Sequence, residues 1–223
     1  MINKYIRSIG VEIECGISNS YLQYLMNNFP IKVDSDGSVN VENPDYLNYS
    51  YNSYPEDEDV WLYNVEIKYY SSNYEELKRF ILTVFNGNYV WQNSSCGNHV
   101  HLKFTKNYYL LTFYTVNNIK RFVDKYRKYA QHQIDTDKYL DRLSNSYCKN
   151  IEHISNIIDN LESDRYYCFN IRCNKKHNRH NFIECRLFPY VMDAQEYLNN
   201  LNFIIDTITE ILESTPTKYV FKI

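Results

Sequence analysis

The stretch GVEIEC at residues 10–15 alternates between acidic and apolar side chains. A β-strand points successive side chains to opposite faces of a sheet. Glu12 and Glu14 would therefore share one face, while Val11, Ile13 and Cys15 share the other. This pattern predicts a strand over residues 8–15 that carries carboxylates on one face and packs its other face into a core.

Two further stretches have the same spacing. CGNHVHL contains His99 and His101, and FIECRLF contains Glu184 and Arg186. In both stretches apolar residues fill the alternate positions, which predicts strands with one polar and one apolar face. Three such strands indicate a sheet with a polar working surface and a packed back.

Composition limits the class of protein. The chain has 223 residues, 44% of them hydrophobic, and a formal net charge of -3. This length suits a single domain, residues 1–223, with its own core. The near-neutral charge gives no reason to expect a nucleic-acid partner, and no apolar run is long enough to span a membrane. The N-terminus lacks the apolar core of a signal peptide, so six cysteines are expected to be reduced thiols in a cytoplasmic protein.

Alternation, capping residues and turn chemistry predict the order of the elements. Strands are expected over residues 8–15, 30–34, 60–70, 98–104, 166–172 and 181–187, with a basic loop joining the last two. Helices are expected over residues 73–85, 106–132 and 150–161, and a last helix should begin after Asp193. Residues 34–38 read as a turn and residues 42–59 as a loop. Hairpin-like strand neighbours among helices favour an α+β fold with an antiparallel sheet.

The last predicted helix carries an apolar stripe, formed by Tyr197, Leu201, Ile204, Ile208 and Ile211. Such a stripe usually packs on the protein's own sheet. It could instead mediate dimerisation, so the sequence leaves a homo-oligomer open.

The polar pairs have the chemistry of a metal site. Carboxylates on neighbouring strands are the hard oxygen ligands that Mg²⁺ or Mn²⁺ prefers, and a neutral imidazole can join them. Glu66, between Val65 and Ile67, adds a further carboxylate. Two divalent ions could therefore be surrounded by Glu12, Glu14, Glu66, His99 and Glu184. So many acids on one face repel each other without cations.

Each motif alone has a common structural explanation. Glu-x-Glu is usually a solvated strand face, and Glu-x-Arg is usually a cross-strand ion pair. The prediction depends on their occurrence together with Asp36-Gly37-Ser38, and with Arg186, which suits bidentate binding of phosphate or carboxylate.

The order GVEIE, DSDGS, a strand glutamate, GNHVHL, RYYCFN and FIECRLF resembles the amidoligase family, over nearly the whole chain. These proteins are compact relatives of glutamine synthetase and glutamate–cysteine ligase in the carboxylate–amine ligase superfamily. The resemblance implies a glutamine-synthetase-like domain whose antiparallel sheet forms a catalytic trough with helices packed on its back. It also implies an ATP-dependent ligase. ATP would phosphorylate a carboxylate substrate, and an amine substrate would attack the acyl phosphate to give an amide.

The resemblance further implies roles for individual residues. Two Mg²⁺ or Mn²⁺ ions would be held by Glu12, Glu14, Glu66, His99 and Glu184. Catalytic roles would belong to Asp36, Glu66 and Arg186, and ATP would contact His101, Arg165, Asn170 and Arg186. The sequence has neither GxxxxGK[ST] nor GxGxxG, so a nucleotide site of the Walker or Rossmann type is not expected.

Three other interpretations stay open. His99 and His101 with carboxylates could hold Zn²⁺ in a hydrolase. The chain could also be a non-catalytic module that binds a nucleotide or peptide on the same fold. Finally, Cys168, Cys173, His177 and His180 are spaced loosely like a zinc knuckle, although core thiols and a solvated basic hairpin are the favoured reading.

Overall fold

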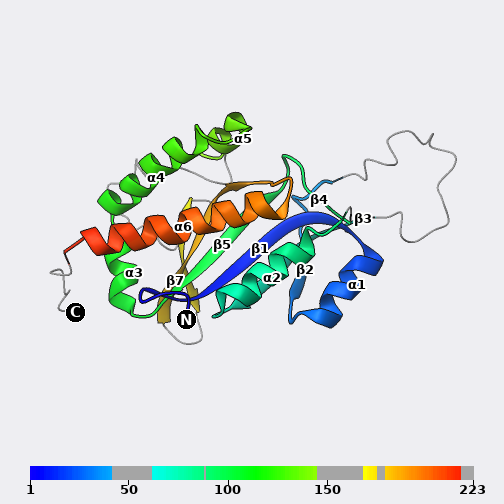
Figure 1. The fold of residues 1–223 in the computed structure, drawn as a ribbon, viewed down its shortest axis with the longest axis horizontal. Coiled ribbons are helices and arrows are strands. Elements are labelled where there is room, and N and C mark those ends of the chain that lie inside the picture. Colours follow the sequence, from blue (N-terminus) through cyan, green and yellow to red (C-terminus); the bar gives the residue numbers. More distant parts are fainter. Residues whose placement is uncertain (42–61, 88, 145–167, 175–178, 217–223) are drawn as a thin grey trace.

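The computed structural model describes residues 1–41, 62–87, 89–144, 168–174 and 179–216. Its strands are β1 (Ile6–Ser18), β2 (Lys32–Ser35), β3 (Leu62–Ser71), β4 (Val90–Trp91), β5 (Gly97–Phe104), β6 (Phe169–Asn174) and β7 (Arg179–Pro189). Within these ranges the strands form one seven-stranded sheet in the order β2-β3-β1-β5-β7-β6, with β4 paired to β1 (Figure 1). Every pairing is antiparallel. The predicted α+β class with an antiparallel sheet is confirmed.

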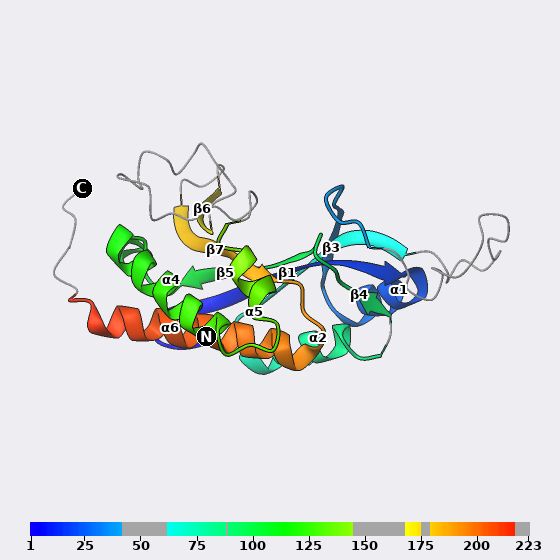
Figure 2. The ribbon, with the colours of Figure 1, turned by 90° about the horizontal axis from the view of Figure 1, so that it is seen from above.

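Helices cover one face of this sheet. In the described ranges they are α1 (Asn19–Asn28), α2 (Tyr74–Val84), α3 (Asn107–Phe113), α4 (Val116–Ala130), α5 (Thr136–Asp141) and α6 (Ala194–Ser214). Figure 2 shows α2 and α6 side by side beneath the sheet. The site described below lies on the opposite face.

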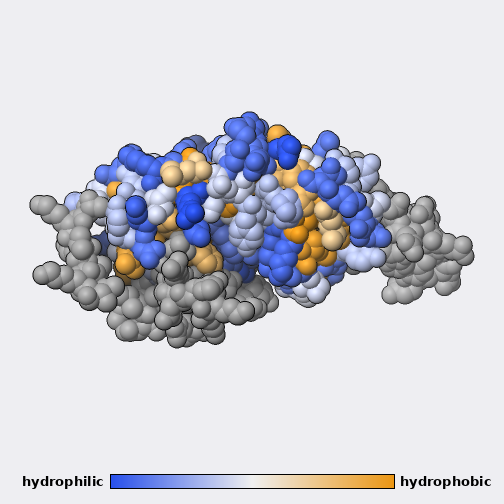
Figure 3. All heavy atoms as spheres, turned by 90° about the horizontal axis from the view of Figure 1, so that it is seen from below, coloured by the Kyte–Doolittle hydropathy of each residue, from blue (hydrophilic) through white to orange (hydrophobic). Residues whose placement is uncertain are grey.

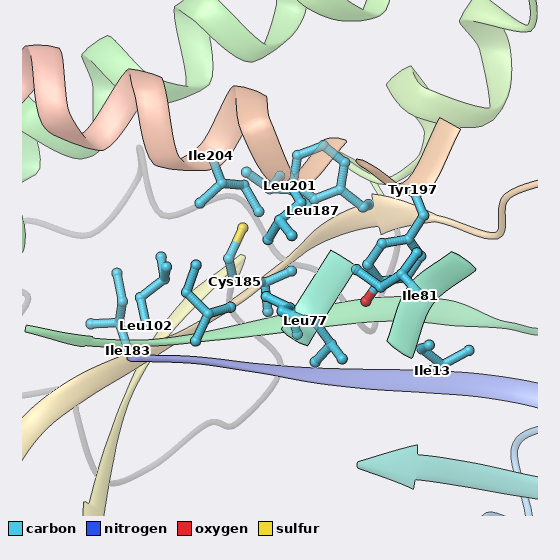
Figure 4. Packing of buried hydrophobic residues seen from close by; sticks show 14 of the residues in the cluster. Ile13, Leu77, Ile81, Leu102, Ile183, Cys185, Leu187, Tyr197, Leu201 and Ile204 are labelled. Atoms are coloured by element: carbon cyan, nitrogen blue, oxygen red, sulfur yellow. The ribbon is translucent and has the colours of Figure 1, made fainter. Parts of the chain in front are cut away.

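The core lies between the sheet and its helical layer. Alternate residues of β1, such as Ile9, Val11 and Ile13, are fully buried there. Figure 4 shows Leu77 and Ile81 of α2, with Leu201 and Ile204 of α6, pointing toward apolar side chains of the strands. The stripe on α6 therefore packs on the protein's own sheet, which was the favoured prediction.

Two predicted helix starts are set by side-chain caps. The side chain of Asn73 accepts a hydrogen bond from the amide of Glu75 at the start of α2. Asp193 does the same for the amide of Glu196 at the start of α6, at 2.8 Å. Such caps satisfy amides that have no partner within the helix. Beyond the end of α2, Gly87 has φ +87°, a conformation that glycine adopts at little cost.

The single helix expected over residues 106–132 is wrong, because the chain breaks between α3 and α4. Thr115 caps α4 by accepting from the amide of Asn118, whose side chain donates back to the carbonyl of Thr112 at 2.7 Å. These local bonds compete with a continuous helix. The apolar period crosses the break unchanged, which explains the error.

Smaller differences concern element boundaries. β1 extends beyond residues 8–15 at both ends, and β2 begins two residues later than expected. α1, α5 and β4 were not predicted. The loop expected over 42–59 and the helix expected over 150–161 lie outside the described residues.

The molecular surface is mainly hydrophilic on the face seen in Figure 3, with apolar residues gathered in a few patches. Among the helices that the structure describes, none is both long enough and apolar enough to cross a membrane.

Candidate metal centre

Strand register brings the predicted polar residues onto one face of the sheet. Glu14 of β1 lies opposite Glu66 of β3, and Glu12 of β1 lies opposite His99 of β5. On the far side of β5, His101 lies opposite Glu184 of β7. Because side chains alternate along each strand, these groups all point away from α2 and α6. Four strands thus contribute to one site.

His99 lies at the centre of this site. Its Nδ1 atom is 3.3 Å from Glu12 Oε2, 3.7 Å from Glu184 Oε1 and 3.8 Å from Glu66 Oε1. Its Nε2 atom is 3.6 Å from Glu14 Oε1. One imidazole is therefore within 4 Å of all four carboxylates. Glu12 and Glu14 come from β1, Glu66 comes from β3, and Glu184 comes from β7.

These five residues form two overlapping sets of potential metal ligands. Glu12, His99 and Glu184 make one set, and Glu14, Glu66 and His99 make the other, with ligand atoms in each set within 4.8 Å of one another. Carboxylate oxygens with one imidazole nitrogen suit Mg²⁺ or Mn²⁺. The residues that the sequence predicted as metal ligands are therefore brought together as a candidate metal-binding group, which we call the acid cluster.

The acid cluster is largely withdrawn from solvent. Glu12 and Glu14 are each 6% exposed, His99 is 2% exposed and Glu184 is fully buried. Burial of a charge costs several kcal/mol unless a partner of opposite sign offsets it. Lys68 Nζ lies 2.6 Å from Glu66 and 3.6 Å from Glu12, and Arg186 bonds Glu184 at 2.7 Å. The four carboxylates still outnumber these two cations.

Crowding of the acids separates their pKa values. Burial alone would raise the pKa of Glu12, but hydrogen bonds from His101 and His99 outweigh it and lower the pKa below the usual range. For Glu66, burial and the neighbouring Glu12 raise the pKa to about 7, against the opposing effect of Lys68. Without metal, therefore, Glu12 is ionised and Glu66 titrates near neutrality, where it can accept or release a proton.

Two pockets flank the acid cluster. The larger, which we call the lysine pocket, has a volume of about 620 Å³ and is lined by Ser8, Gly10, Glu12, Lys68, Tyr70, His101, Lys103 and Phe182. The smaller, which we call the arginine pocket, has a volume of about 250 Å³ and is lined by Glu14, Ser38, Ser94, Ser95, His99, Arg142 and Arg186. The acid cluster contributes residues to both, so molecules bound in the two pockets would meet at it.

His101 belongs to the wall of the lysine pocket. Its Nε2 atom is 3.1 Å from Glu12 Oε1, and its Nδ1 atom is 3.4 Å from the hydroxyl of Tyr70. Phe182 stacks on its ring, with centroids 6.0 Å apart. His101 belongs to neither of the two ligand sets formed by the described residues, and its predicted contact with ATP stays a prediction.

The other predicted site residues are placed differently. Asn170 is buried on β6 opposite Glu184, on the polar face. Asp36 lies outside both ligand sets of the described residues, and its carboxylate accepts hydrogen bonds from the amide and the hydroxyl of Ser38 at the rim of the arginine pocket. Arg165 lies outside the described residues.

Sequence reasoning missed Lys68 and Tyr70, although the signal was present. Both follow Glu66 at alternate positions of the same strand, so both point to the polar face. Arg142, which follows α5, carried no local signal. Its NH2 group donates to the carbonyl of Arg186 at 3.1 Å, which fixes it in the arginine pocket.

Gly97 is a further residue that the sequence did not mark. A Cβ atom there would lie 2.6 Å from Arg142 NH2 and 3.1 Å from His99 Nε2. The amide of Gly97 also donates a hydrogen bond to the carboxylate of Glu14. A side chain at this position would therefore occupy the space that the acid cluster and Arg142 share.

The zinc knuckle is not supported by the described part of the chain. Cys168 is buried in the core, with its backbone carbonyl bonded to the amide of Arg186. His177 lies outside the described residues, and so do the side chains of Cys173 and His180.

Comparison with known proteins adds no assignment. A scan against protein-family models found no match for this chain, and a search of curated proteins found none either.

Proposed function

We propose that this protein is an ATP-dependent carboxylate–amine ligase, which forms an amide through an acyl phosphate with the help of two divalent cations. The observation that carries the proposal is the acid cluster: four carboxylates and His99, gathered from four strands and flanked by two pockets. The resemblance of the motif order to the amidoligase family supports the same reading, including a glutamine-synthetase-like domain.

Charge supports two cations rather than one. The two ligand sets share only His99, and each contributes two carboxylates of its own. Lys68 and Arg186 offset part of this negative charge, while bound Mg²⁺ or Mn²⁺ would offset the remainder and neutralise phosphate oxygens.

The pockets suggest where the substrates bind. The lysine pocket combines two lysines with the aromatic rings of Tyr70 and Phe182, and its volume of about 620 Å³ is within the usual range of small-molecule and cofactor pockets. We assign ATP to it. The arginine pocket is smaller, and its cationic and hydroxyl groups suit an acid, so we assign the carboxylate substrate to it.

In this scheme a carboxylate oxygen of the acid attacks the γ-phosphorus of ATP, and the bond to the leaving ADP breaks. Arg186 and Lys68 offset negative charge on either side of the transferred group. The amine nitrogen then attacks the acyl carbon, inorganic phosphate leaves, and the nitrogen loses a proton. Glu66 and Asp36 are the carboxylates assigned to accept that proton.

The zinc hydrolase is the second candidate, and the ligand chemistry disfavours it. Catalytic zinc sites usually take three protein ligands rich in histidine. Here each described ligand set contains two carboxylates and one histidine.

Thermal melting with ATP tests the proposal, in the presence and absence of Mg²⁺ or Mn²⁺. A ligand at about a hundred times its dissociation constant adds about 2.7 kcal/mol to the folded state. We expect a clear rise in Tm that requires both ATP and the metal. Stabilisation by Zn²⁺ alone would favour the hydrolase, and ATP binding without turnover of any acid–amine pair would favour the binding module.

Two variants test whether ATP turnover depends on the acid cluster. Glu184→Gln keeps the shape of the buried side chain and its contact with Arg186, but removes one ligand charge. We expect ADP release to fall by at least a hundredfold, while Glu210→Gln, a surface exchange on α6, leaves it unchanged. Full activity of Glu184→Gln would overturn the assignment.

A further inference from the structure

Arg142 is a buried cation that forms no ion pair with an acidic residue in the described part of the chain. The residue is 8% exposed, and its single hydrogen bond within the described part of the chain joins NH2 to the backbone carbonyl of Arg186. The Nε atom is buried and has no hydrogen-bond partner there. Arginine is always charged at physiological pH, and a buried charge without a counter-ion is costly. Such a group is suited to an anion that arrives with a ligand.

Arg142 lies in the wall of the arginine pocket. It lines the arginine pocket of about 250 Å³ together with Ser38, Ser94 and Ser95, and Glu14 and His99 of the acid cluster line the same pocket. Ser38 and Ser94 are exposed and mark the mouth of the pocket. Arg186, the second guanidinium, is already bonded to Glu184. Within the described residues, Arg142 is therefore the cation of this pocket that forms no ion pair with a carboxylate.

We propose that Arg142 is the specificity-determining residue for the acid substrate, and that this substrate is a small dicarboxylic acid. One carboxylate lies at the acid cluster, where it is phosphorylated. The second pairs with the guanidinium of Arg142 and accepts a hydrogen bond from the hydroxyl of Ser94 at the mouth. This inference rests on the proposed ligase function for the first carboxylate, whereas the second follows from the orphaned guanidinium and the pocket volume.

Binding of simple acids tests the proposal without turnover. Tm is measured in Mg²⁺ with glutarate or glutamate, and with the matched monocarboxylates butyrate and 4-aminobutyrate. We expect the dicarboxylates to stabilise the protein and the monocarboxylates to bind at least about tenfold more weakly, as the loss of a charge-assisted hydrogen bond implies. Equal stabilisation by both classes would overturn the proposal.

Substitutions locate the effect at Arg142. Arg142→Gln is expected to weaken dicarboxylate binding by about ten- to a hundredfold and to abolish the preference over monocarboxylates. Arg127→Gln, an arginine exchange on the exposed side of α4, is the control and should leave the preference intact. An unchanged preference in Arg142→Gln would refute the inference.

A second variant covers the case in which Arg142→Gln does not fold. Ser94→Asp changes an exposed residue at the mouth and adds a negative charge that opposes a second carboxylate. It should lower dicarboxylate affinity more than monocarboxylate affinity, and equal loss for both would count against the proposal.

The two hypotheses fail separately. Arg142-dependent dicarboxylate binding without any response to Mg²⁺ and ATP would leave the carboxylate site at Arg142 standing and remove the ligase. A response to Mg²⁺ and ATP without dicarboxylate preference would do the reverse.

Discussion

Lys68→Met tests whether the acid cluster needs cations to remain folded. The substitution keeps an unbranched side chain but removes the ammonium group, which lies 2.6 Å from Glu66, 3.1 Å from Asp34 and 3.6 Å from Glu12. At an effective dielectric constant of about 20, the attraction to Glu66 is roughly 6 kcal/mol and that to Glu12 roughly 5 kcal/mol before desolvation is counted. The three carboxylates also hold the pKa of Lys68 above its usual value, although burial alone would lower it.

The net cost is smaller than this gross attraction. Removal of one partner from a buried ion pair costs about 3–5 kcal/mol. Lys68 keeps 19% of its side chain exposed, so we expect about 3 kcal/mol. For a chain of this length that corresponds to a fall in Tm of about 6–12 °C. Mg²⁺ should recover part of the loss, because it supplies the missing positive charge, so the gain in Tm with Mg²⁺ should be larger in the variant.

Thermal and urea unfolding in EDTA, repeated in Mg²⁺, measure both quantities. Lys125→Met is the control, because its ion pair with Glu210 lies on the surface, where solvent screens the attraction and the pair contributes little to stability. If Lys68→Met were as stable in EDTA as Lys125→Met, or gained no more from Mg²⁺ than the wild type, the electrostatic account of the cluster would be wrong.

Two further predictions concern the same face. Gly97→Ala should lower the unfolding free energy by about 1–3 kcal/mol and reduce Mg²⁺ binding, because its Cβ would lie 2.6 Å from Arg142. Gly37→Ala is the control, because its Cβ would meet nothing within 4 Å, and this variant should keep Mg²⁺ binding. Equal Mg²⁺ titrations for the two variants would contradict the prediction. The second concerns pH in EDTA. The pKa of Glu66 is raised to about 7 in the folded protein, above its unfolded value near 4.5. Its contribution to stability is therefore complete below pH 4.5 and is lost as pH rises through 7. Urea unfolding between pH 5.5 and 8.5 should show this loss, and Glu66→Gln should reduce it; an identical slope in the variant would exclude Glu66 as the cause.

Strand alternation explains why the acid cluster could be predicted from sequence. A period of two fixes which side chains share a face, so Glu12 with Glu14 and His99 with His101 required no knowledge of pairing. The remaining requirement is the pairing register of these strands. That register is fixed because the apolar faces of β1 and β5 must both be buried in the core. The same rule applies to Lys68, which was overlooked beside Glu66.

Other features depend on contacts between segments distant in sequence. Arg142 reaches the site from the end of a short helix, and its bond to the backbone of Arg186 leaves no trace in local sequence. The importance of Gly97 likewise depends on Arg142 and Glu14, whose side chains come from other segments. The break between α3 and α4 arises from hydrogen bonds of Thr115 and Asn118, which an apolar period cannot reveal.

The position of β7 in the sheet has a consequence for synthesis of the chain. β1 finds its partners β3 and β5 by residue 104, but β7 is added between β5 and β6 only after residues 179–189 have been made. A nascent chain before that point would expose the hydrogen-bonding edge of β5 and lack the carboxylate of Glu184. Folding dominated by such long-range pairing is slow, and an open strand edge is prone to pair with other chains. The site is therefore completed among the last steps of folding, and the interval before β7 docks is when aggregation competes with it.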